Sequence, residues 1–306
     1  MLCSPPRDNG ERSDRCYNRL MTALSYEQIL NYRRQTFRLS PDQKLKSKEE
    51  AVAYVNERGF IYFWPIKGIT MPALWTAVAG DRPVADEHDD SGHVTWGWKD
   101  ELLPARRWYY GKVLRKRATI ISLDVAPAFY SLSENYGEPE LDYLSQYNAG
   151  QLTHEAKTVY EVLLQNGPLD TPEIRRKARM TARSSDAPFN RAIELLQSDF
   201  KILPVGVAEV GRWKYAFIYE CVHRWYPELP ERARTIRQRD ARIKLAELYL
   251  GSVGAAQARQ LDLLFGWGKA DTRAAVEALV SSGFALQNMR VEDHGDNWLA
   301  VSSLLD

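Results

Sequence analysis

Residues 153–165 read THEAKTVYEVLLQ, and their apolar side chains recur three and four positions apart, as on one buried face of a helix. The next residues, Asn-Gly-Pro at 166–168, end that helix. Thr171 followed by Pro172 begins another helix, with Thr171 as the N-cap and Pro172 in the first turn. A third helix is predicted over 188–198, which reads PFNRAIELLQS. This segment therefore contains three helices joined by short turns.

Two extended segments follow the third helix, at 201–209 and 213–222, with a turn at 210–212 between them. Three helices followed by a β-hairpin are the element order of a winged helix. The same order recurs, with weak sequence similarity, as helices at 231–250, 255–265 and 271–282 and strands at 284–291 and 298–301. We therefore predict tandem winged-helix domains, in a mainly α fold with small β-hairpin wings that belongs to the α+β class.

The region before residue 150 has its own helix and strand signals. Residues 25–37 and 71–79 are predicted helices, the second with a proline near its first turn. Between them, Ser47 starts a helix with a capping box, and Gly59 stops it. The apolar run Gly59–Ile66 is too short for a helix and predicts a buried strand. We expect a mostly helical, winged-helix-like N-terminal domain.

The length of 306 residues favours two or three domains, and 44% hydrophobic with 11% aromatic residues excludes disorder over most of the chain. The predicted divisions are a disordered extension at 1–24, an N-terminal domain at 25–150, a central winged helix at 151–228 and a C-terminal winged helix at 229–306. No stretch is apolar enough for a membrane span, and the N-terminal stretch lacks the apolar core of a secretory signal.

The cysteine and histidine patterns exclude several kinds of site. Three cysteines, Cys3, Cys16 and Cys221, form no C-x-x-C pair, which argues against a disulfide framework or a zinc finger and favours a reducing cytoplasm. The five histidines lack metal-motif spacing, and there is no P-loop or G-x-G-x-x-G. We expect no metal and no cofactor.

A formal charge of +1, from 41 basic and 40 acidic residues, hides a strong segregation of charge along the chain. Residues 106–117 read RRWYYGKVLRKR, with no acid and three aromatic residues. The basic residues of this segment are Arg106, Arg107, Lys112, Arg115, Lys116 and Arg117. Cations release counterions from phosphates, and aromatic rings can stack on unpaired bases, so the pattern favours nucleic-acid binding. The alternative is a solvated helix face with core aromatics.

A second basic group lies on the last two helices of the central winged helix, with only Asp186 expected to oppose it. Its members are Arg175, Arg176, Lys177, Arg179, Arg183 and Arg191. In helix-turn-helix proteins the last helix enters the major groove while flanking groups hold phosphates. Arg212, Trp213 and Lys214 lie at the predicted wing tip, which could reach a neighbouring groove. The alternative is a solvated basic surface.

Four aromatic residues, Tyr62, Trp64, Trp96 and Trp98, could line a pocket that stacks an extruded base. Such residues are more often part of the core. Asp100 and Glu101 follow them and are the candidate catalytic carboxylates.

Several segments resemble the winged-helix DNA glycosylases of the AlkZ (YcaQ) type. The resemblance rests on Gly167-Pro168, Arg175-Arg176, Phe189–Ala192, the segment Tyr219–Pro227, which reads YECVHRWYP, and the ending Gly295–Leu299. It covers about residues 25–306 at low identity. It implies tandem winged helices around a concave basic channel and excision of alkylated or cross-linked bases from DNA by hydrolysis of the N-glycosidic bond.

The resemblance also locates the expected catalytic positions. The family's Gln-hydrophobic-Gln or Gln-hydrophobic-Asp motif falls nearest to Tyr62-Phe63-Trp64, which has no amide or carboxylate at either position. The family's histidine falls near Trp96–Lys99, which has none. A carboxylate can stabilise the positive charge that develops on the sugar, so Asp100 or Glu101 is the available substitute.

Three functions remain open from the sequence. The first is a cytoplasmic, monomeric protein of DNA repair that binds duplex or damaged DNA without the usual catalytic motif. The second is a DNA glycosylase with non-standard catalytic residues. The third is a winged-helix transcriptional regulator, although a regulator needs a dimer to match half-sites and no dimerisation helix is evident.

Overall fold

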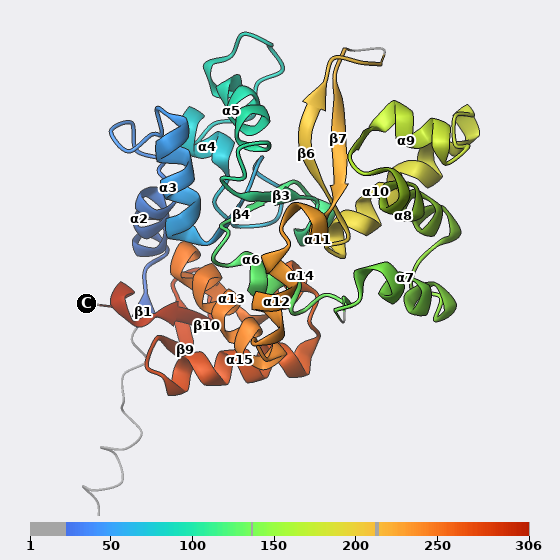
Figure 1. The fold of residues 1–306 in the computed structure, drawn as a ribbon. Coiled ribbons are helices and arrows are strands. Elements are labelled where there is room, and N and C mark those ends of the chain that lie inside the picture. Colours follow the sequence, from blue (N-terminus) through green and yellow to red (C-terminus); the bar gives the residue numbers. More distant parts are fainter. Residues whose placement is uncertain (1–22, 136, 212–213, 306) are drawn as a thin grey trace, which may run out of the picture.

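The computed structural model describes residues 23–135, 137–211 and 214–305, and within them one connectivity occurs three times (Figure 1). Each repeat runs helix, strand, helix, helix, strand, strand. In each sheet the last strand lies between the other two, giving the orders β2-β4-β3, β5-β7-β6 and β8-β10-β9. The fold is therefore mixed α+β with small sheets, which confirms the predicted class. The sheets are larger than the predicted hairpins: two have three strands, and the third has four because β1 (Ala23–Leu24) pairs with β9.

The elements of the three repeats follow one another along the chain. The first repeat comprises α3 (Lys48–Arg58), β2 (Phe60–Tyr62), α4 (Leu74–Ala79), α5 (Val94–Leu102), β3 (Tyr109–Gly111) and β4 (Thr119–Ile121). The second comprises α8 (His154–Asn166), β5 (Leu169–Asp170), α9 (Thr171–Lys177), α10 (Asp186–Ser198), β6 (Ile202–Ala208) and β7 (Ala216–Cys221). The third comprises α13 (Gln238–Val253), β8 (Ala255–Gln257), α14 (Ala258–Phe265), α15 (Lys269–Ser281), β9 (Ala285–Val291) and β10 (Gly295–Val301).

Shorter elements connect and extend the repeats. They are β1 (Ala23–Leu24), α2 (Tyr26–Thr36), α6 (Ala126–Tyr130), α7 (Pro139–Asn148), α11 (Val222–Trp225) and α12 (Glu228–Arg234), with 3₁₀ turns η1 (Ser91–His93), η2 (Leu114–Lys116), η3 (Arg183–Ser185) and η4 (Ser302–Leu304). No helix among these described residues is long and apolar enough to cross a membrane.

The central repeat follows the predicted order of three helices and a hairpin, with two changes: the short strand β5 lies between the first two helices, and the second helix has a different N-cap. Thr153 caps α8, since its hydroxyl oxygen accepts a hydrogen bond from the Ala156 amide at 3.2 Å. The N-cap of α9 is Asp170, not Thr171, because the Asp170 carboxylate accepts from the Glu173 amide at 2.9 Å. The Thr171 hydroxyl instead donates to the Phe217 carbonyl at 3.2 Å and ties the helix to β7.

The C-terminal repeat departs from its predicted helices at two places. The single helix expected over 231–250 is two helices, α12 and α13, separated at 235–237, where Arg237 has an extended backbone. The helix expected to start at Ala255 begins with strand β8, which pairs with β10. This pairing satisfies backbone groups with a partner more than forty positions away, which a local pattern does not reveal.

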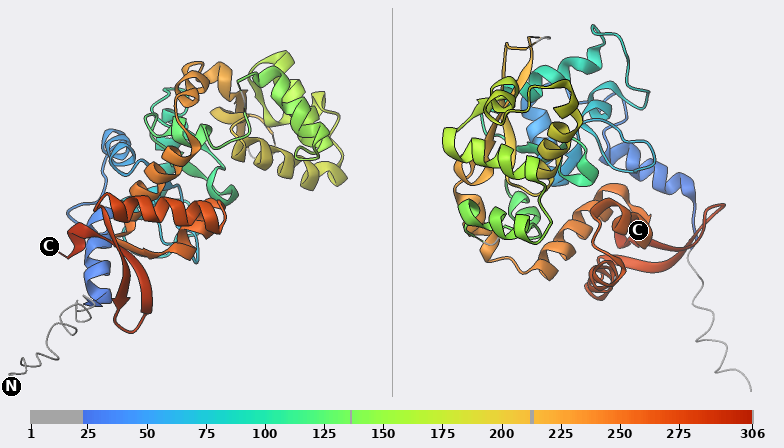
Figure 2. Two further views of the ribbon diagram at one scale, coloured as in Figure 1. Left: turned by 90° about the horizontal axis from the view of Figure 1, so that it is seen from below. Right: turned by 90° about the vertical axis from the view of Figure 1, so that its right-hand side faces the viewer.

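The start of the described chain packs on the end of it. Strand β1 lies parallel to β9, and Leu24 is fully buried, so Ala23 and Leu24 are ordered rather than part of a disordered extension. The Arg33 guanidinium of α2 donates to the carbonyls of Val253 and Ala255, each at 2.9 Å. Figure 2 shows the blue α2 beside the red C-terminal elements. The helix predicted at 25–37 therefore packs with the third repeat. The remaining residues of the predicted extension, 1–22, lie outside the described part of the chain.

In the first repeat, the predicted strand and the predicted helix at 71–79 are both present but shorter than expected. Gly59, at φ 79°, ends α3 as expected, because a residue without Cβ adopts this conformation without strain. Only Phe60–Tyr62 of the predicted strand is paired. Helix α4 begins at Leu74 rather than next to Pro72, since the Pro72 carbonyl accepts from the Tyr62 amide at 2.9 Å and stays extended beside β2.

The three repeats share much of their core. One apolar cluster joins side chains of the first and third repeats, among them Phe60, Tyr62, Tyr249 and Leu250. A second cluster fills the central repeat and includes Tyr143 of α7. In Figure 1 the β6–β7 hairpin projects between α5 and the helices of the central repeat. The hairpin is therefore the element through which the first and second repeats approach each other at this end.

Candidate nucleic-acid interface

The basic segment 106–117 forms strand β3 and the connection from β3 to β4, rather than a helix face. Trp108, Tyr109 and Tyr110 are buried, and their rings pack inside the fold. They therefore cannot stack on unpaired bases in this structure, and the predicted stacking role of these three aromatic residues is wrong. The basic side chains at the two ends of the segment are exposed, and Lys112 is half-buried.

Three cations of this segment occupy backbone conformations that L-residues rarely adopt. The φ angles of Arg106, Arg115 and Lys116 are 51°, 54° and 55°. A residue with a side chain in the left-handed region costs about 1 kcal/mol or more, and Gly or Asn are the usual occupants. The chain instead places exposed, charged side chains at these strained turns, and strained residues of this kind cluster at functional sites.

The hairpin connection lies against the last helix of the central repeat. The Lys112 amide donates to the Gln197 side-chain carbonyl at 3.1 Å, and its ammonium forms an ion pair with Glu194 at 2.7 Å. The 3₁₀ turn η2 packs against both α10 and α14. The structure thereby brings the basic segment of the first repeat next to α10, which carries Arg191.

The second basic group is more strongly paired than its sequence suggests. Arg175 pairs with Asp186 at 2.5 Å, while Arg176 and Lys177 both approach Glu173, at 2.6 and 4.0 Å. Glu173 therefore opposes this group as well as Asp186, which corrects the expected charge balance. The Glu173 carboxylate has a pKa below its ordinary value, mainly through its hydrogen bond from Arg176.

Nine of the thirteen cations predicted to bind DNA within the described residues make no ion pair there. They are Arg106, Arg107, Arg115, Lys116, Arg117, Arg179, Arg183, Arg191 and Lys214. All nine are exposed, and the Arg106 guanidinium also lies over the Trp225 ring at 4.1 Å. The other two residues proposed at the wing tip, Arg212 and Trp213, fall outside the described residues. These nine cations therefore keep a positive charge that no ion pair within the described part of the chain offsets.

The four aromatic residues proposed as a base pocket separate into two pairs. Tyr62 is 0% exposed and Trp98 8%, and both lie in closed apolar packing, so neither can stack on an entering base in this structure. Trp96 is 41% exposed and Trp64 is half-buried, with their ring centroids 5.8 Å apart. Only Trp64 and Trp96 reach the surface.

The lysine next to these residues lies at the centre of an aromatic cage. The Lys99 side chain is 0% exposed, and its ammonium donates to the Tyr215 hydroxyl at 2.6 Å and contacts the Asp100 carboxylate at 2.7 Å. The ammonium also lies 4.5–5.9 Å from five ring centroids, those of Phe63, Trp96, Tyr110, Tyr215 and Phe217. Burial lowers the pKa of Lys99, and the Asp100 carboxylate opposes that shift.

The two candidate carboxylates have different surroundings. Asp100 accepts hydrogen bonds from Lys99 and from the Tyr215 hydroxyl, the latter at 2.9 Å, and its side chain is 22% exposed. Burial, with Asp100 nearby, raises the pKa of Tyr215 above its ordinary range, so the hydroxyl stays protonated as a donor. Glu101 points elsewhere and pairs with Lys48 at the surface. Of the two candidate carboxylates, Asp100 therefore contacts Lys99 and Tyr215, and Glu101 does not.

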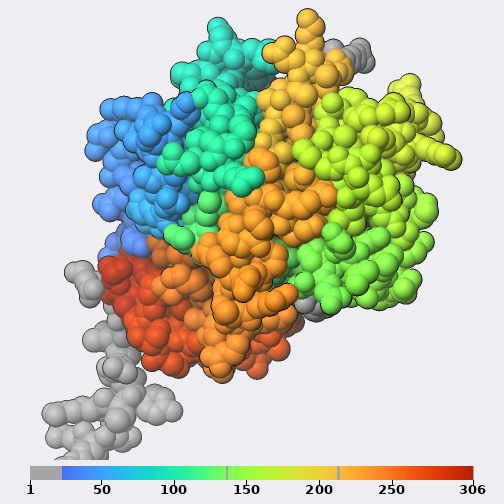
Figure 3. All heavy atoms as spheres, in the orientation of Figure 1, coloured from blue at the N-terminus to red at the C-terminus, as the bar shows by residue number. Residues whose placement is uncertain are grey.

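Sequence reasoning missed Lys99 and Tyr215, which are 116 positions apart. The run Trp96–Asp100 did contain a signal, since a lysine preceded by two tryptophans and followed by an acid is suited to a cation held among rings. Its partner on the β6–β7 hairpin had no such signal. Figure 3 shows the yellow hairpin beside the teal surface of the first repeat.

Comparison with known proteins agrees with this architecture. No curated protein matches the chain significantly. The DNA glycosylase AlkZ of Streptomyces sahachiroi is similar in fold, with a TM-score of 0.57 and 13% identity over 92% of this chain and 71% of that one. A family model described as AlkZ related matches residues 45–266. Because that match covers more than half of the sequence, the chain belongs to the AlkZ-related family.

Proposed function

We propose that this protein binds duplex or damaged DNA in DNA repair, and that each of its three repeats is a winged helix. The observation that carries the proposal is the group of nine exposed, unpaired cations on the first two repeats. Free cations bind phosphates by releasing counterions, whereas paired cations must first lose a partner. The kinship with a DNA glycosylase supports a repair role.

The proposed contacts follow the connectivity of the repeats. In the second repeat, α10 is the last helix before the hairpin and carries Arg191, while Lys214 lies near the hairpin tip. In the first repeat, the corresponding hairpin connection carries Arg115, Lys116 and Arg117. Helix and wing cations of this kind contact phosphates and position the protein, with little reading of base sequence. We therefore expect salt-sensitive binding with weak sequence preference, which also separates this function from a transcriptional regulator.

The sharpest test uses the left-handed positions. In the double variant Arg115→Asn/Lys116→Asn, two charges are lost while asparagine suits the backbone, so stability should be retained. We expect weaker DNA binding and a salt slope smaller by about two, because each lost phosphate contact removes about 0.9 from the slope. Fluorescence anisotropy with labelled duplex at several salt concentrations measures both.

The matched control removes two exposed, unpaired cations elsewhere, in Lys67→Gln/Arg239→Gln. Its affinity and salt slope should stay close to those of the unaltered protein. The proposal is wrong if the unaltered protein binds no DNA at low salt, or if the control weakens binding as much as the left-handed pair does.

A second candidate function, hydrolysis of the N-glycosidic bond, is favoured by the cage around Lys99. Asp100 is a partly exposed carboxylate that contacts Lys99 and Tyr215, and Phe63 of the cage belongs to the segment where the resemblance places the catalytic motif. In this role Asp100 stabilises the positive charge that develops on the sugar as the base leaves.

Release of free base from alkylated or cross-linked DNA tests the second candidate. Asp100→Asn should abolish release, and Glu101→Gln should not, because Glu101 faces away from the cluster and pairs with Lys48. The two substitutions remove the same charge at adjacent positions, so each is the control for the other. If the unaltered protein binds DNA but releases no base, DNA binding alone remains as the function.

A further inference from the structure

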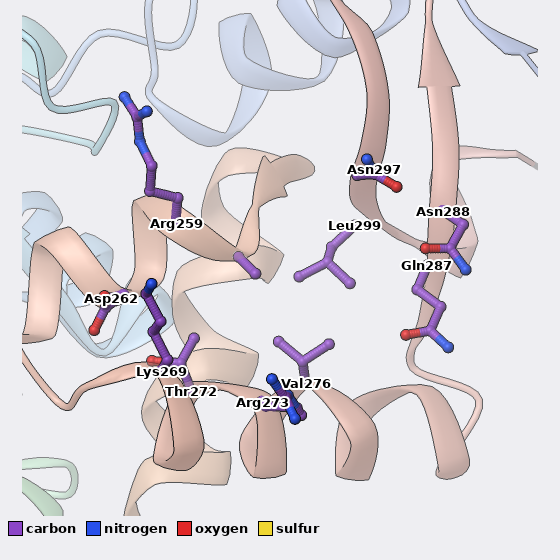
Figure 4. A pocket seen from close by; sticks show the side chains of 11 residues that line it. Arg259, Asp262, Lys269, Thr272, Arg273, Val276, Gln287, Asn288, Asn297 and Leu299 are labelled. Atoms are coloured by element: carbon purple, nitrogen blue, oxygen red, sulfur yellow. The ribbon is translucent and has the colours of Figure 1, made fainter.

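A separate hollow of about 480 Å³ lies in the third repeat, between α14, α15 and the β9–β10 hairpin. Figure 4 shows Val276 and Leu299 pointing toward each other at its centre, with the helices on one side and the strands on the other. Both side chains are buried and form an apolar floor. The hollow has the size of small-molecule sites, which span about 300–1,000 Å³.

The helix side of the hollow is positively charged. Arg259 of α14 and Lys269 and Arg273 of α15 line it, and within the described residues none of the three makes an ion pair. One acid, Asp262, lies among them, and its carboxylate already accepts from the Gly268 amide at 2.9 Å. The site therefore suits an anion such as a phosphate.

The strand side of the hollow carries amides. Gln287 and Asn288 of β9 and Asn297 of β10 line it, and their side chains form no hydrogen bond with other described residues. Asn288 and Asn297 are held in the left-handed region, at φ 60° and 66°. Asparagine and glutamine amides can both donate and accept, and they match the edges of nucleobases bidentately.

One buried group at the hollow lacks a partner. The Thr272 side chain is on α15 and is 3% exposed, and its hydroxyl forms no hydrogen bond with the described residues. An unpaired buried hydroxyl is costly, so a ligand that supplies a partner would gain from it. This group is independent of the surface charges around it.

We infer that this hollow binds a nucleotide unit, with the phosphate on Lys269 and Arg273, the base face on Val276 and Leu299, and the base edge on the amides. The chemistry is shared by a free nucleotide and by one nucleotide of a nucleic-acid strand. The inference goes beyond the proposed function, because most of the lining follows residue 266, where the family match ends, and none of it belongs to the basic segments of the first two repeats.

Isothermal titration of the full chain with dAMP, inorganic phosphate and a single-stranded dA₁₂ tests the inference. We expect saturable dAMP binding that is tighter than phosphate binding. Lys269→Gln/Arg273→Gln should weaken it about tenfold or more, as loss of charge-assisted hydrogen bonds does. Asn288→Gly/Asn297→Gly should weaken dAMP but leave phosphate binding unchanged, and glycine keeps both left-handed turns unstrained.

Arg290→Gln is the matched control, since Arg290 is exposed on β9 and does not line the hollow. It should leave dAMP binding unchanged, as should Arg115→Asn/Lys116→Asn. Tighter binding of dA₁₂ than of dAMP, with a loss of dA₁₂ affinity in Lys269→Gln/Arg273→Gln, identifies a strand as the source, and tighter binding of dAMP identifies a free nucleotide. Absence of saturable dAMP and dA₁₂ binding, equal affinity for phosphate and dAMP, or an equal loss in Arg290→Gln overturns the inference. Failure of duplex binding would reject the proposed function alone.

Discussion

Lys99 shows how one residue can connect two repeats. Its ammonium is removed from water and surrounded by five rings, the Tyr215 hydroxyl and the Asp100 carboxylate. Cation–π contacts, charge-assisted hydrogen bonds and the adjacent carboxylate together offset the desolvation of the charge. Lys99 and the Tyr215–Asp100 hydrogen bond join the β6–β7 hairpin to α5, and the Trp96 ring of α5 packs edge-on against Tyr215.

Substitution of Lys99 separates its packing from its charge. Lys99→Met fills the cage and leaves Asp100 partly solvated with the Tyr215 donor, so we expect a stability change within about 1 kcal/mol. Lys99→Ala opens a cavity among the rings and should cost about 2 kcal/mol more. Urea unfolding of the two variants measures the difference. Equal losses in both would show that the charge itself carries the stability.

At the scale of the element, the three repeats use the same connectivity with different surface chemistry. The hairpin connections of the first two repeats carry the unpaired cations Arg115, Lys116 and Lys214, whereas that of the third carries Glu292 and Asp293. The proposed duplex contacts therefore belong to the hairpin connections of the first two repeats. In the third repeat, three unpaired cations of α14 and α15 line the hollow instead.

The start of α9 provides a test of capping. Asp170→Ala removes the acceptor for the Glu173 amide and should lower the free energy of unfolding by about 1 kcal/mol. Asp170→Asn keeps an acceptor at the same position and should cost only a few tenths of that amount. Thermal or urea unfolding distinguishes the two variants. If Asp170→Asn were as destabilising as Asp170→Ala, the carboxylate charge rather than the cap would be the cause.

At the scale of the whole molecule, buried tyrosines dominate the dependence of stability on pH above neutrality. Burial raises the pKa of nine core tyrosines above their ordinary value, among them Tyr249 to about 12. Burial lowers the pKa values of Lys99 and Lys201, which makes stability rise with pH. These two lysines are outnumbered by the nine tyrosines, whose raised pKa values have the opposite effect.

We therefore expect stability to fall as the pH rises above 10. There the unfolded chain loses phenolic protons that the folded chain retains, so the unfolded state binds fewer protons and the free energy of unfolding decreases with pH. Below pH 10 the tyrosine contribution is fully present. Thermal unfolding between pH 8 and 11, followed with tyrosinate absorbance, measures the effect. Ionisation of the nine buried tyrosines near pH 10 without unfolding would contradict it.

Local patterns in the sequence determined much of this protein. The helix faces, the caps at Ser25, Ser47 and Thr153, the hairpins and the segregation of charge all follow from contacts within about four residues or from the alternation along a strand. For the same reason, the sequence alone predicts the order of the central helices and hairpin, the candidate cations and the family resemblance.

Tertiary structure decided what those residues contact. Strand β8 exists because β10 pairs with it, and Tyr62 and Trp98 are core because two repeats close over them. Lys112 is paired because the first repeat packs on Glu194 of the second. The Lys99–Tyr215 contact and the hollow of the third repeat join residues whose own neighbours in the sequence carry no record of the partner. Such contacts depend on how the elements pack, and packing is set by the whole chain rather than by a window of it.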